Sequence, residues 1–212
     1  LSHGDVRVRP LRVRDARRWQ QLRQSNNDWL QEWEATSPMP SLEPPPTFRQ
    51  SAKRMLTEAK LGRTMPFVVE YQGSFVGQIN VSDITYGSLR GCHFGYWIDE
   101  SVSDKRVMTT AAALVTDHLL QTLALHRIEI AVRPENIPSN RLAIRLGYTF
   151  EGIRPAFLHI NRQRFLVHQS KNPWREMFAS VFSSRCIVLI TYNMSSAIGS
   201  FENCFKISAA AV

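Results

Sequence analysis

The stretch that decides the fold is LHRIEIAVRPENIPSNRLAIRLGYTFEG, residues 125–152. Apolar residues occupy every second position in the middle of 126–133, which is typical of a strand with one buried face. The segment 138–148 predicts a short helix that ends at Gly147. Residues 149–160 then predict another strand, so this stretch indicates a strand, helix and strand in succession.

The residues before this stretch predict antiparallel strands and a helix. Segments 66–71 and 74–84 alternate around a Gln-Gly turn and predict a hairpin, and 91–99 predicts a third strand. A polar loop, 100–110, then enters an apolar helix predicted to start at Ala111. The start of such a helix presents free backbone N–H groups and positive dipole charge, which together suit an anion.

The N-terminal part predicts one strand and several helices. Residues 6–15 alternate arginines with apolar residues, as expected of a strand with an exposed basic face, and Asp15 is a candidate N-cap. Segment 16–33 is interrupted by Ser-Asn-Asn and predicts two short helices rather than one. The proline-rich segment 37–46 excludes a helix, and 47–62 predicts another helix with a glycine at its end.

Composition excludes several classes of protein. The 212 residues carry a net charge of +8, which favours anionic partners. The basic N-terminal residues lack accompanying aromatic side chains, so no direct nucleic-acid readout is expected. Cys92, Cys186 and Cys204 form neither a disulfide framework nor a zinc pattern, so no metal site is predicted. No apolar run is long enough for a membrane span, and we expect a cytoplasmic protein.

The predicted elements form a single domain of the α/β (α+β) class. We expect the domain to cover residues 1–180, with an irregular C-terminal appendage at 181–212. The chain is expected to be a monomer or a homodimer.

The element order, GYWIDESV at 95–102 and the RPENIPSNR and LGY motifs of 133–148 together resemble a known family. They are similar to the GCN5-related N-acetyltransferase (GNAT) superfamily, and within it to the RimJ/RimL branch of ribosomal-protein alanine N-acetyltransferases. The resemblance covers roughly residues 6–160. It implies a mixed central sheet of about six to seven strands flanked by helices, in which the splayed parallel strands 94–99 and 127–133 hold acetyl-CoA.

The resemblance also implies how residues contact the cofactor. Free backbone groups of Trp97, Ile98 and Asp99 are expected to pair with the pantetheine amides. Asn136 and Asn140 are expected to contact the cofactor. The matching serine, Ser139, is expected to protonate the departing thiolate, although a serine at this position could also serve as the helix N-cap.

The loop before the apolar helix occupies the place of the family's pyrophosphate-binding loop. Its expected residues are Ser103, Asp104, Lys105, Arg106, Val107, Met108 and Thr109. Asp104 and Arg106 replace the two glycines of the family pattern, and glycine lets a backbone approach an anion closely. The Asp104 carboxylate would repel pyrophosphate, whereas Lys105 and Arg106 would partly offset that repulsion.

No carboxylate matches the general base of the family unambiguously. The corresponding position falls near Leu158, which cannot accept a proton. Glu129 and Glu100 are candidates for deprotonating an amine through water, and His159 is a third. Each could instead take part in a surface ion pair.

Taken together, the sequence predicts an acetyl-CoA-dependent N-acetyltransferase that acts on a protein or peptide N-terminus, such as that of a ribosomal protein. Two alternatives stay open. One is a related enzyme with a small-molecule amine as acceptor, and the other is a degenerate member that binds a partner without catalysis.

Overall fold

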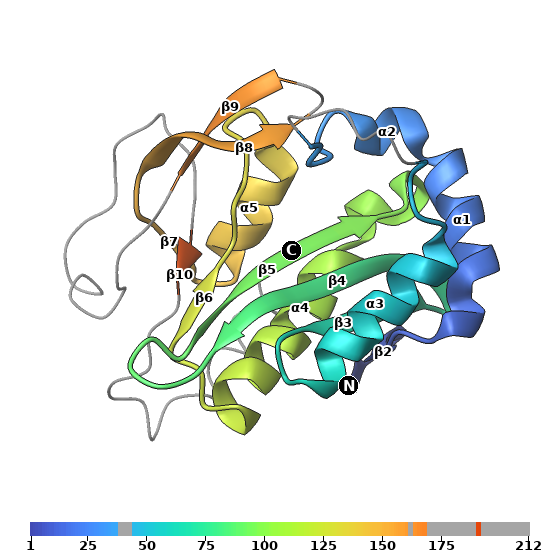
Figure 1. Ribbon diagram of the computed structural model, residues 1–212, viewed down its shortest axis with the longest axis horizontal. Coiled ribbons are helices and arrows are strands. Elements are labelled where there is room, and N and C mark those ends of the chain that lie inside the picture. Colours follow the sequence, from blue (N-terminus) through green and yellow to red (C-terminus); the bar gives the residue numbers. More distant parts are fainter. Residues whose placement is uncertain (38–43, 161–162, 169–189, 192–212) are drawn as a thin grey trace.

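The computed structural model describes residues 1–37, 44–160, 163–168 and 190–191. Six strands form one mixed sheet in the order β1 to β6 (Figure 1). They are β1 (Ser2–His3), β2 (Val6–Pro10), β3 (Met65–Tyr71), β4 (Ser74–Thr85), β5 (Gly91–Ile98) and β6 (Arg127–Glu129). All neighbours are antiparallel except β5 and β6, which are parallel. The predicted mixed sheet of six to seven strands is confirmed.

Helices cover both faces of this sheet (Figure 1). They are η1 (Val13–Asp15), α1 (Ala16–Ser25), α2 (Asn27–Gln31), α3 (Phe48–Lys60), η2 (Glu100–Lys105), α4 (Val107–Asp117), η3 (His118–Thr122) and α5 (Ile137–Arg145). α1 and α3 lie on one face and α4 on the other. The predicted division of 16–33 into two helices is confirmed, and α3 begins at a Thr47 capping box.

Alternation along the strands produces a separate core on each face of the sheet. Phe67 and Val69 of β3 belong to the larger core, which also contains the buried side of α4, whereas Val68 between them faces the smaller core. In the smaller core, Trp19 stacks on Phe48 with ring centroids 4.2 Å apart. The two cores fix α1, α3 and α4 against the sheet, and with them the loops at its edge.

Asp15 lies at the predicted N-cap position of α1, but its side chain makes no capping hydrogen bond to that helix. Its carboxylate instead accepts hydrogen bonds from the Arg12 backbone N–H and from the Arg9 guanidinium, both at 2.8 Å. Glu70 binds the same guanidinium at 2.6 Å. Burial alone would raise the pKa of Asp15, but the bonds from Arg9 and Arg12 outweigh burial and lower it. Arg9 is therefore part of a half-buried ion cluster and does not belong to an exposed strand face.

The predicted strand 149–160 is divided in two. β7 (Thr149–Phe150) and β8 (Ile153–Ile160) are separated at Glu151-Gly152, where Gly152 has φ +141°. β8 pairs with β9 (Gln163–His168), and β7 pairs with β10 (Ile190–Thr191). A backbone conformation that side chains rarely adopt interrupts the extended chain here, which the alternating sequence did not reveal.

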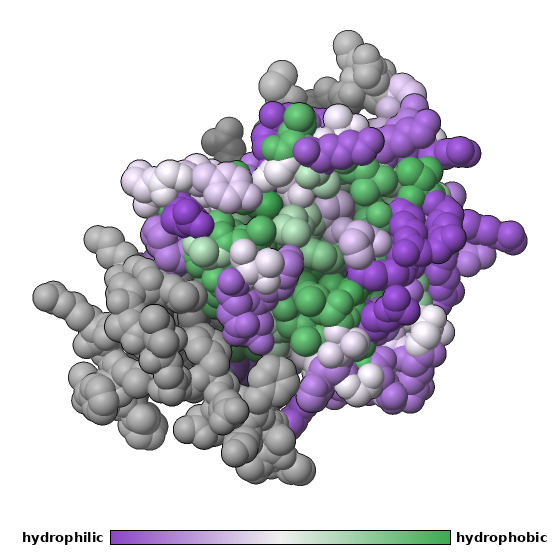
Figure 2. Space-filling view, turned by 90° about the horizontal axis from the view of Figure 1, so that it is seen from below, coloured by the Kyte–Doolittle hydropathy of each residue, from purple (hydrophilic) through white to green (hydrophobic). Residues whose placement is uncertain are grey.

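Several sequence predictions lie outside the described residues. These are Cys186, Cys204 and nearly all of the appendage 181–212. None of the described helices is long and apolar enough to span a membrane. Figure 2 shows an apolar area in the middle of the face seen from below, with hydrophilic side chains gathered on the right, where α1 lies in Figure 1.

Candidate active site

The two parallel strands diverge after a short paired segment. β6 pairs with β5 only from Gly91 to His93, whereas β5 continues along β4 as far as Ile98. Gly77 on β4 fits closely against the far part of β5, because a Cβ added there would lie 2.6 Å from the Trp97 carbonyl oxygen. From Phe94 to Ile98, the edge of β5 that faces β6 therefore has no paired strand among the described residues. This is expected if the two parallel strands splay apart, as predicted.

The three residues expected to offer backbone groups lie at the end of β5. The Trp97 indole packs in the smaller core and donates to Gln78 Oε1 at 3.3 Å, so its side chain is occupied with packing. The Ile98 carbonyl accepts a hydrogen bond from the Trp29 indole at 3.2 Å. The Asp99 carboxylate accepts from the Ser101 N–H and hydroxyl. These contacts immobilise the strand end beside the opening between β5 and β6.

The predicted polar loop is largely helical. Residues 100–105 form the 3₁₀ helix η2, and α4 begins at Val107 instead of at Ala111. Arg106 is the N-cap residue of α4, yet its side chain makes no capping hydrogen bond. The first-turn N–H groups of Val107, Met108 and Thr109 are the donors that have no partner within a helix. They form the positive end of α4, where an anion would be favoured.

Arg106 adopts a left-handed backbone conformation, which glycine favours. Its φ and ψ are +56° and +13°, in the left-handed region. Asp104, at the other glycine position, lies within η2 and is not among the residues with positive φ. Arg106 therefore holds a strained left-handed conformation that glycine would adopt freely, whereas Asp104 does not.

We expect Arg106→Gly to raise the free energy of unfolding by about 1 kcal/mol, because glycine adopts this conformation without the penalty of a side chain. Asp104→Gly is the matched control. It should lower stability by about 0.5 kcal/mol, because glycine adds chain entropy within η2. Urea unfolding of both variants measures the difference. Destabilisation by Arg106→Gly would show that contacts of the arginine side chain outweigh the strain.

The charges of this loop are spread over its surface. Asp104, Lys105 and Arg106 are exposed, and Ser103 is half-buried. The Lys105 ammonium lies 5.8 Å from the centre of the Tyr71 ring, in a cation–π contact. The two cations that were predicted to compensate for Asp104 are thus present beside the amides that begin α4.

The start of α5 holds the predicted asparagines and serine. Asn136 is the N-cap, and its side-chain oxygen accepts a hydrogen bond from the Ser139 N–H at 3.1 Å. Ser139 therefore does not cap the helix. The buried Asn140 donates to the carbonyls of Arg133, Pro134 and Asn136, at 3.2, 3.3 and 2.7 Å. These hydrogen bonds stabilise the turn that precedes α5. The side-chain oxygen of Asn140 is buried and has no partner among the described residues.

The Ser139 hydroxyl contacts a tyrosine on β5 that the sequence analysis did not single out. The Tyr96 hydroxyl lies 2.5 Å from Ser139 Oγ, in a hydrogen bond that either group can donate. Burial raises the pKa of Tyr96 to about 12, although its bond to Ser139 opposes that effect. Tyr96 is therefore protonated at neutral pH. The strand alternation that turns Phe94, Tyr96 and Ile98 toward α4 and α5 was the signal that could have indicated this contact.

Glu129 lies at the opposite, paired end of β5 and β6. Its carboxylate binds His93 Nε2 at 3.3 Å and Arg127 Nε at 2.7 Å, and Arg154 lies 3.7 Å away. The hydrogen bond from His93, aided by Arg127, outweighs burial and lowers the pKa of Glu129 to about 2. Such a carboxylate is a poor proton acceptor at neutral pH.

The other two candidates for the base lie on different elements. Glu100 is exposed at the start of η2, and its backbone N–H donates to Asn26 Oδ1 at 2.9 Å. His159 lies on β8, and its Nδ1 is 2.9 Å from the Thr36 hydroxyl. The structure thus brings Ser139 close to β5 and places Glu100 at the end of that strand, while Glu129 belongs to a separate ion cluster.

Comparison with known proteins identifies the family. The sequence model of the Acetyltransferase (GNAT) domain matches residues 5–149, well over half of the chain. The protein belongs to the GNAT acetyltransferase family. It is therefore an N-acetyltransferase that uses acetyl-CoA as its acetyl donor.

Two curated relatives are similar over most of this GNAT acetyltransferase. The probable N-acetyltransferase YjcK of Bacillus subtilis is 29% identical over 166 residues, which cover 76% of this chain and 90% of the relative. The ribosomal protein uS5-alanine N-acetyltransferase of Escherichia coli is 28% identical over 166 residues, covering 77% and 84%.

A solved structure agrees with the fold. Mycobacterium smegmatis RimJ in complex with CoA-disulfide superposes with a TM-score of 0.79 at 27% identity, covering 96% of this chain and 89% of that one. Ribosomal-protein-S5-alanine acetyltransferase from Vibrio fischeri is 24% identical with a TM-score of 0.70, and it supports the fold alone.

The donor set of the site fits acetyl-CoA. The unpaired side of β5 offers backbone groups suited to amides, and the first turn of α4 offers N–H groups suited to pyrophosphate. The buried Asn140 side-chain oxygen, which has no partner in the part of the chain that the structure describes, is a further polar group at this end of the fold. A Cβ at Gly95, on the unpaired stretch of β5, would meet no atom within 4 Å, so the strand is open there. The residues present therefore suit the cofactor without the missing glycines.

Proposed function

We propose that this GNAT acetyltransferase acetylates the N-terminal amine of a ribosomal protein in the cytoplasm. The observation that carries the chemistry is the Tyr96–Ser139 hydrogen bond beside the open stretch of β5. The acceptor class is supported by the E. coli relative, whose name states that it acetylates the alanine of ribosomal protein uS5.

Bound acetyl-CoA would supply an activated acetyl thioester. We propose that the backbone of Trp97, Ile98 and Asp99 and the side chains of Asn136 and Asn140 hold its pantetheine arm. The pyrophosphate would lie against residues 103–109, where α4 begins with uncapped N–H groups. Fixing the thioester beside β5 would place it for attack and remove the entropic cost of encounter.

Ser139 is proposed to deliver the proton that the thiolate leaving group needs. Because Tyr96 stays protonated, its hydroxyl can donate to Ser139 Oγ and leave the serine hydrogen directed at sulfur. A proton lost from Ser139 can then be replaced from Tyr96, and the resulting phenolate regains a proton from solvent before the next turnover. Proton donation of this kind contributes roughly 10²- to 10⁴-fold to a rate.

Glu100 is the better of the two carboxylates proposed as the base. It is exposed at the end of β5, on the side where Asn26 and Trp29 approach that strand. Glu129 is bound by cations and has a pKa of about 2, so it would rarely take a proton from an ammonium group. We therefore propose that Glu100 accepts the amine proton through water.

Mass spectrometry of peptides tests the proposal directly. A mixture of peptides beginning with Ala, Ser or Thr should gain one acetyl group each at the α-amine when incubated with the enzyme and acetyl-CoA. An α-N-blocked copy of each peptide is the control, and it should stay unmodified even where it contains lysine. Acetylation of small amines such as spermidine, with no reaction of any peptide, would refute the protein-acceptor proposal.

A further inference from the structure

A strip of the sheet beside the proposed active site is open. Gln78 and Asn80 on β4 share the face that carries the smaller core, since Ile79 between them belongs to the larger one. Gln78 is only 2% exposed, whereas Asn80 is half-buried and Gly95, opposite it on β5, is exposed. A Cβ added at Gly95 would meet no atom within 4 Å. The open strip, defined by Asn80 and Gly95, therefore adjoins the part of β5 that lies beyond its pairing with β6.

A chain of hydrogen bonds fixes the orientation of the Asn80 side chain. An indole nitrogen can only donate, and the indoles of Trp19 and Trp97 both donate to Gln78 Oε1, at 2.9 and 3.3 Å. The nitrogen of the Gln78 amide then donates to Asn80 Oδ1 at 2.7 Å. Asn80 therefore turns its oxygen toward Gln78 and its NH₂ group away from it.

The Asn80 NH₂ group has no partner in the described part of the chain. There, the Asn80 side chain takes part only in the hydrogen bond from Gln78. Its cross-strand neighbours are Pro66 on β3 and Gly95 on β5, and neither has a side-chain acceptor. Ser82, the next residue on this face of β4, donates to Asp83 at 3.1 Å. Two N–H donors of Asn80 are therefore available at the open strip, where they suit a carbonyl or carboxylate oxygen.

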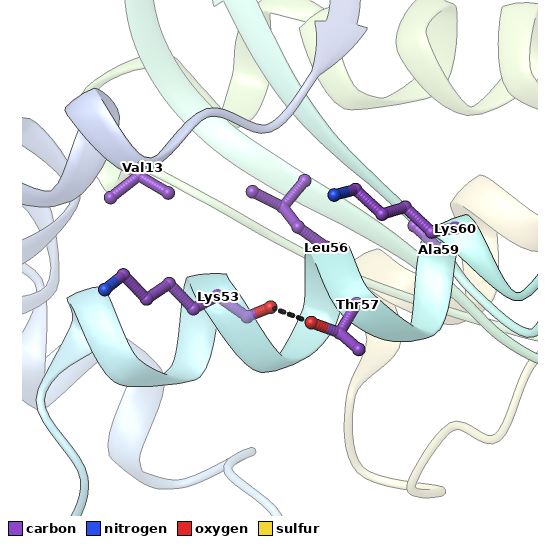
Figure 3. A pocket seen from close by; sticks show the side chains of 6 residues that line it. All are labelled: Val13, Lys53, Leu56, Thr57, Ala59 and Lys60. Atoms are coloured by element: carbon purple, nitrogen blue, oxygen red, sulfur yellow. Dashed lines mark hydrogen bonds between the residues drawn. The ribbon is translucent and has the colours of Figure 1, made fainter.

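A hollow between η1 and α3 is less suited to an amine acceptor (Figure 3). It has a volume of about 610 Å³ and is lined by Val13, Lys53, Leu56, Thr57, Ala59 and Lys60. The ammonium groups of Lys53 and Lys60 would repel a charged N-terminal amine. The Thr57 hydroxyl already donates to the Lys53 carbonyl at 3.0 Å (Figure 3). The open strip has free donors and adjoins β5, so it is the better place for the acceptor.

We propose that the N-terminal residue of the acceptor lies over Gly95 and that its carbonyl oxygen accepts a hydrogen bond from the Asn80 NH₂ group. In one residue the amine nitrogen and the carbonyl oxygen are only three bonds apart, and neighbouring strands are about 4.8 Å apart. An oxygen held at Asn80 on β4 therefore leaves the amine beside β5, where the thioester is proposed to lie. Gly95 and Tyr96 face opposite sides of the sheet, so the amine approaches from the side opposite the Tyr96 hydroxyl.

This role of Asn80 rests on the proposed function and narrows it. A carbonyl next to the amine is present in every peptide N-terminus and is absent from a polyamine such as spermidine. Asn80 is therefore a specificity-determining residue that favours peptides over simple amines, and Trp19, Trp97 and Gln78 are the residues that position it.

Asn80→Asp tests this role, because aspartate keeps an oxygen that accepts from Gln78 and removes both donors. For a peptide that begins with Ala, KM should rise more than about tenfold, since two oxygens would then face each other. The value of kcat should change less than about threefold, because the contact is the same in the ground state and the transition state. The KM for acetyl-CoA should also stay within about threefold, as measured by steady-state kinetics.

A second measurement changes the peptide instead of the enzyme. An (E)-alkene in place of the first peptide bond removes the carbonyl and keeps the amine. It should raise KM about tenfold for the wild type and leave KM no higher than for the parent peptide in Asn80→Asp. Thr57→Ala is the matched control, which removes a polar side chain from the hollow of Figure 3 and should keep each constant within about twofold.

The possible failures are distinguishable. If the wild type acetylates no peptide, the proposed function is overturned, and the role of Asn80 with it. If the wild type acetylates peptides and neither Asn80→Asp nor the alkene raises KM, only the role of Asn80 is overturned. A lower KM in Asn80→Asp would also overturn it, because a carboxylate attracts an ammonium group and the amine would then lie at Asn80.

Discussion

Replacing Ser139 by alanine is expected to lower kcat about 100-fold while the KM for acetyl-CoA changes less than about threefold. The hydroxyl would act only when the thiolate departs, so its loss should affect the rate and not binding of the donor. Stability should fall by only about 1 kcal/mol, because the Tyr96 hydroxyl loses its bond to Ser139 while Asn136 still caps α5. Steady-state kinetics and thermal melts of the same preparation measure both effects.

Tyr96→Phe extends the test. The proposed proton transfer from Tyr96 to Ser139 predicts that the effects of Tyr96→Phe and Ser139→Ala on kcat are not additive. Removing the Tyr96 hydroxyl should lower kcat about tenfold. The double variant should be no slower than Ser139→Ala alone, because Tyr96 acts through the serine.

Thr116→Val is the matched control. The Thr116 hydroxyl bonds to the buried Tyr148 hydroxyl at 2.9 Å, which is the same kind of contact elsewhere in the core. This variant should lose about 1 kcal/mol of stability and keep kcat. If Ser139→Ala changed melting temperature and left kcat intact, the serine would be a structural residue.

The sequence predicted the fold well because hydrophobic periodicity carried most of the information. The hairpin β3–β4 and the strand β5 lie within one or two residues of their predicted bounds, since their alternation reflects the two cores directly. The entrance to α4 was predicted four residues late. Its first turn begins with Val107 and Met108, which are apolar and buried, but the sequence analysis counted them with the polar loop that precedes them.

The candidate site was harder to predict, because it depends on contacts between distant residues. Arg106 has a positive φ, a conformation that the sequence pattern did not indicate at an arginine. The partner of Ser139 is Tyr96, which lies 43 residues away on β5. Glu129 was a candidate base only while its neighbours were unknown. Arg127 lies two residues away in the sequence and could have been recognised as a partner. His93 and Arg154 come from β5 and β8, so only the structure shows that they surround Glu129.

Glu129→Gln is expected to lower the free energy of unfolding by about 2 kcal/mol near pH 6. The pKa of Glu129 falls from its ordinary 4.5 to about 2 on folding, and we discount the resulting figure because the group is only half-buried. A lowered carboxyl pKa gives stability that is present above about pH 4.5 and is lost as pH falls toward 2.

The partner of Glu129 sets the upper limit of this pH window. The pKa of His93 is raised from 6.5, first by its bond to Glu129 and then by Asp83. A raised histidine pKa gives stability that is present below pH 6.5 and is lost as pH rises through the folded value. The difference between wild type and Glu129→Gln should therefore be largest between about pH 4.5 and 6.5, as measured by urea unfolding at a series of pH values.

Glu135→Gln provides the control for this variant. Glu135 is exposed and lies 3.3 Å from Arg133, so its loss should cost less than about 0.5 kcal/mol. Peptide acetylation by the same variants separates an effect on stability from an effect on catalysis. Glu129→Gln should keep kcat within about threefold of wild type, whereas Glu100→Gln should lower kcat more than tenfold. A hundredfold loss of kcat in Glu129→Gln without a change in stability would return Glu129 to the role of base and remove Glu100 from it.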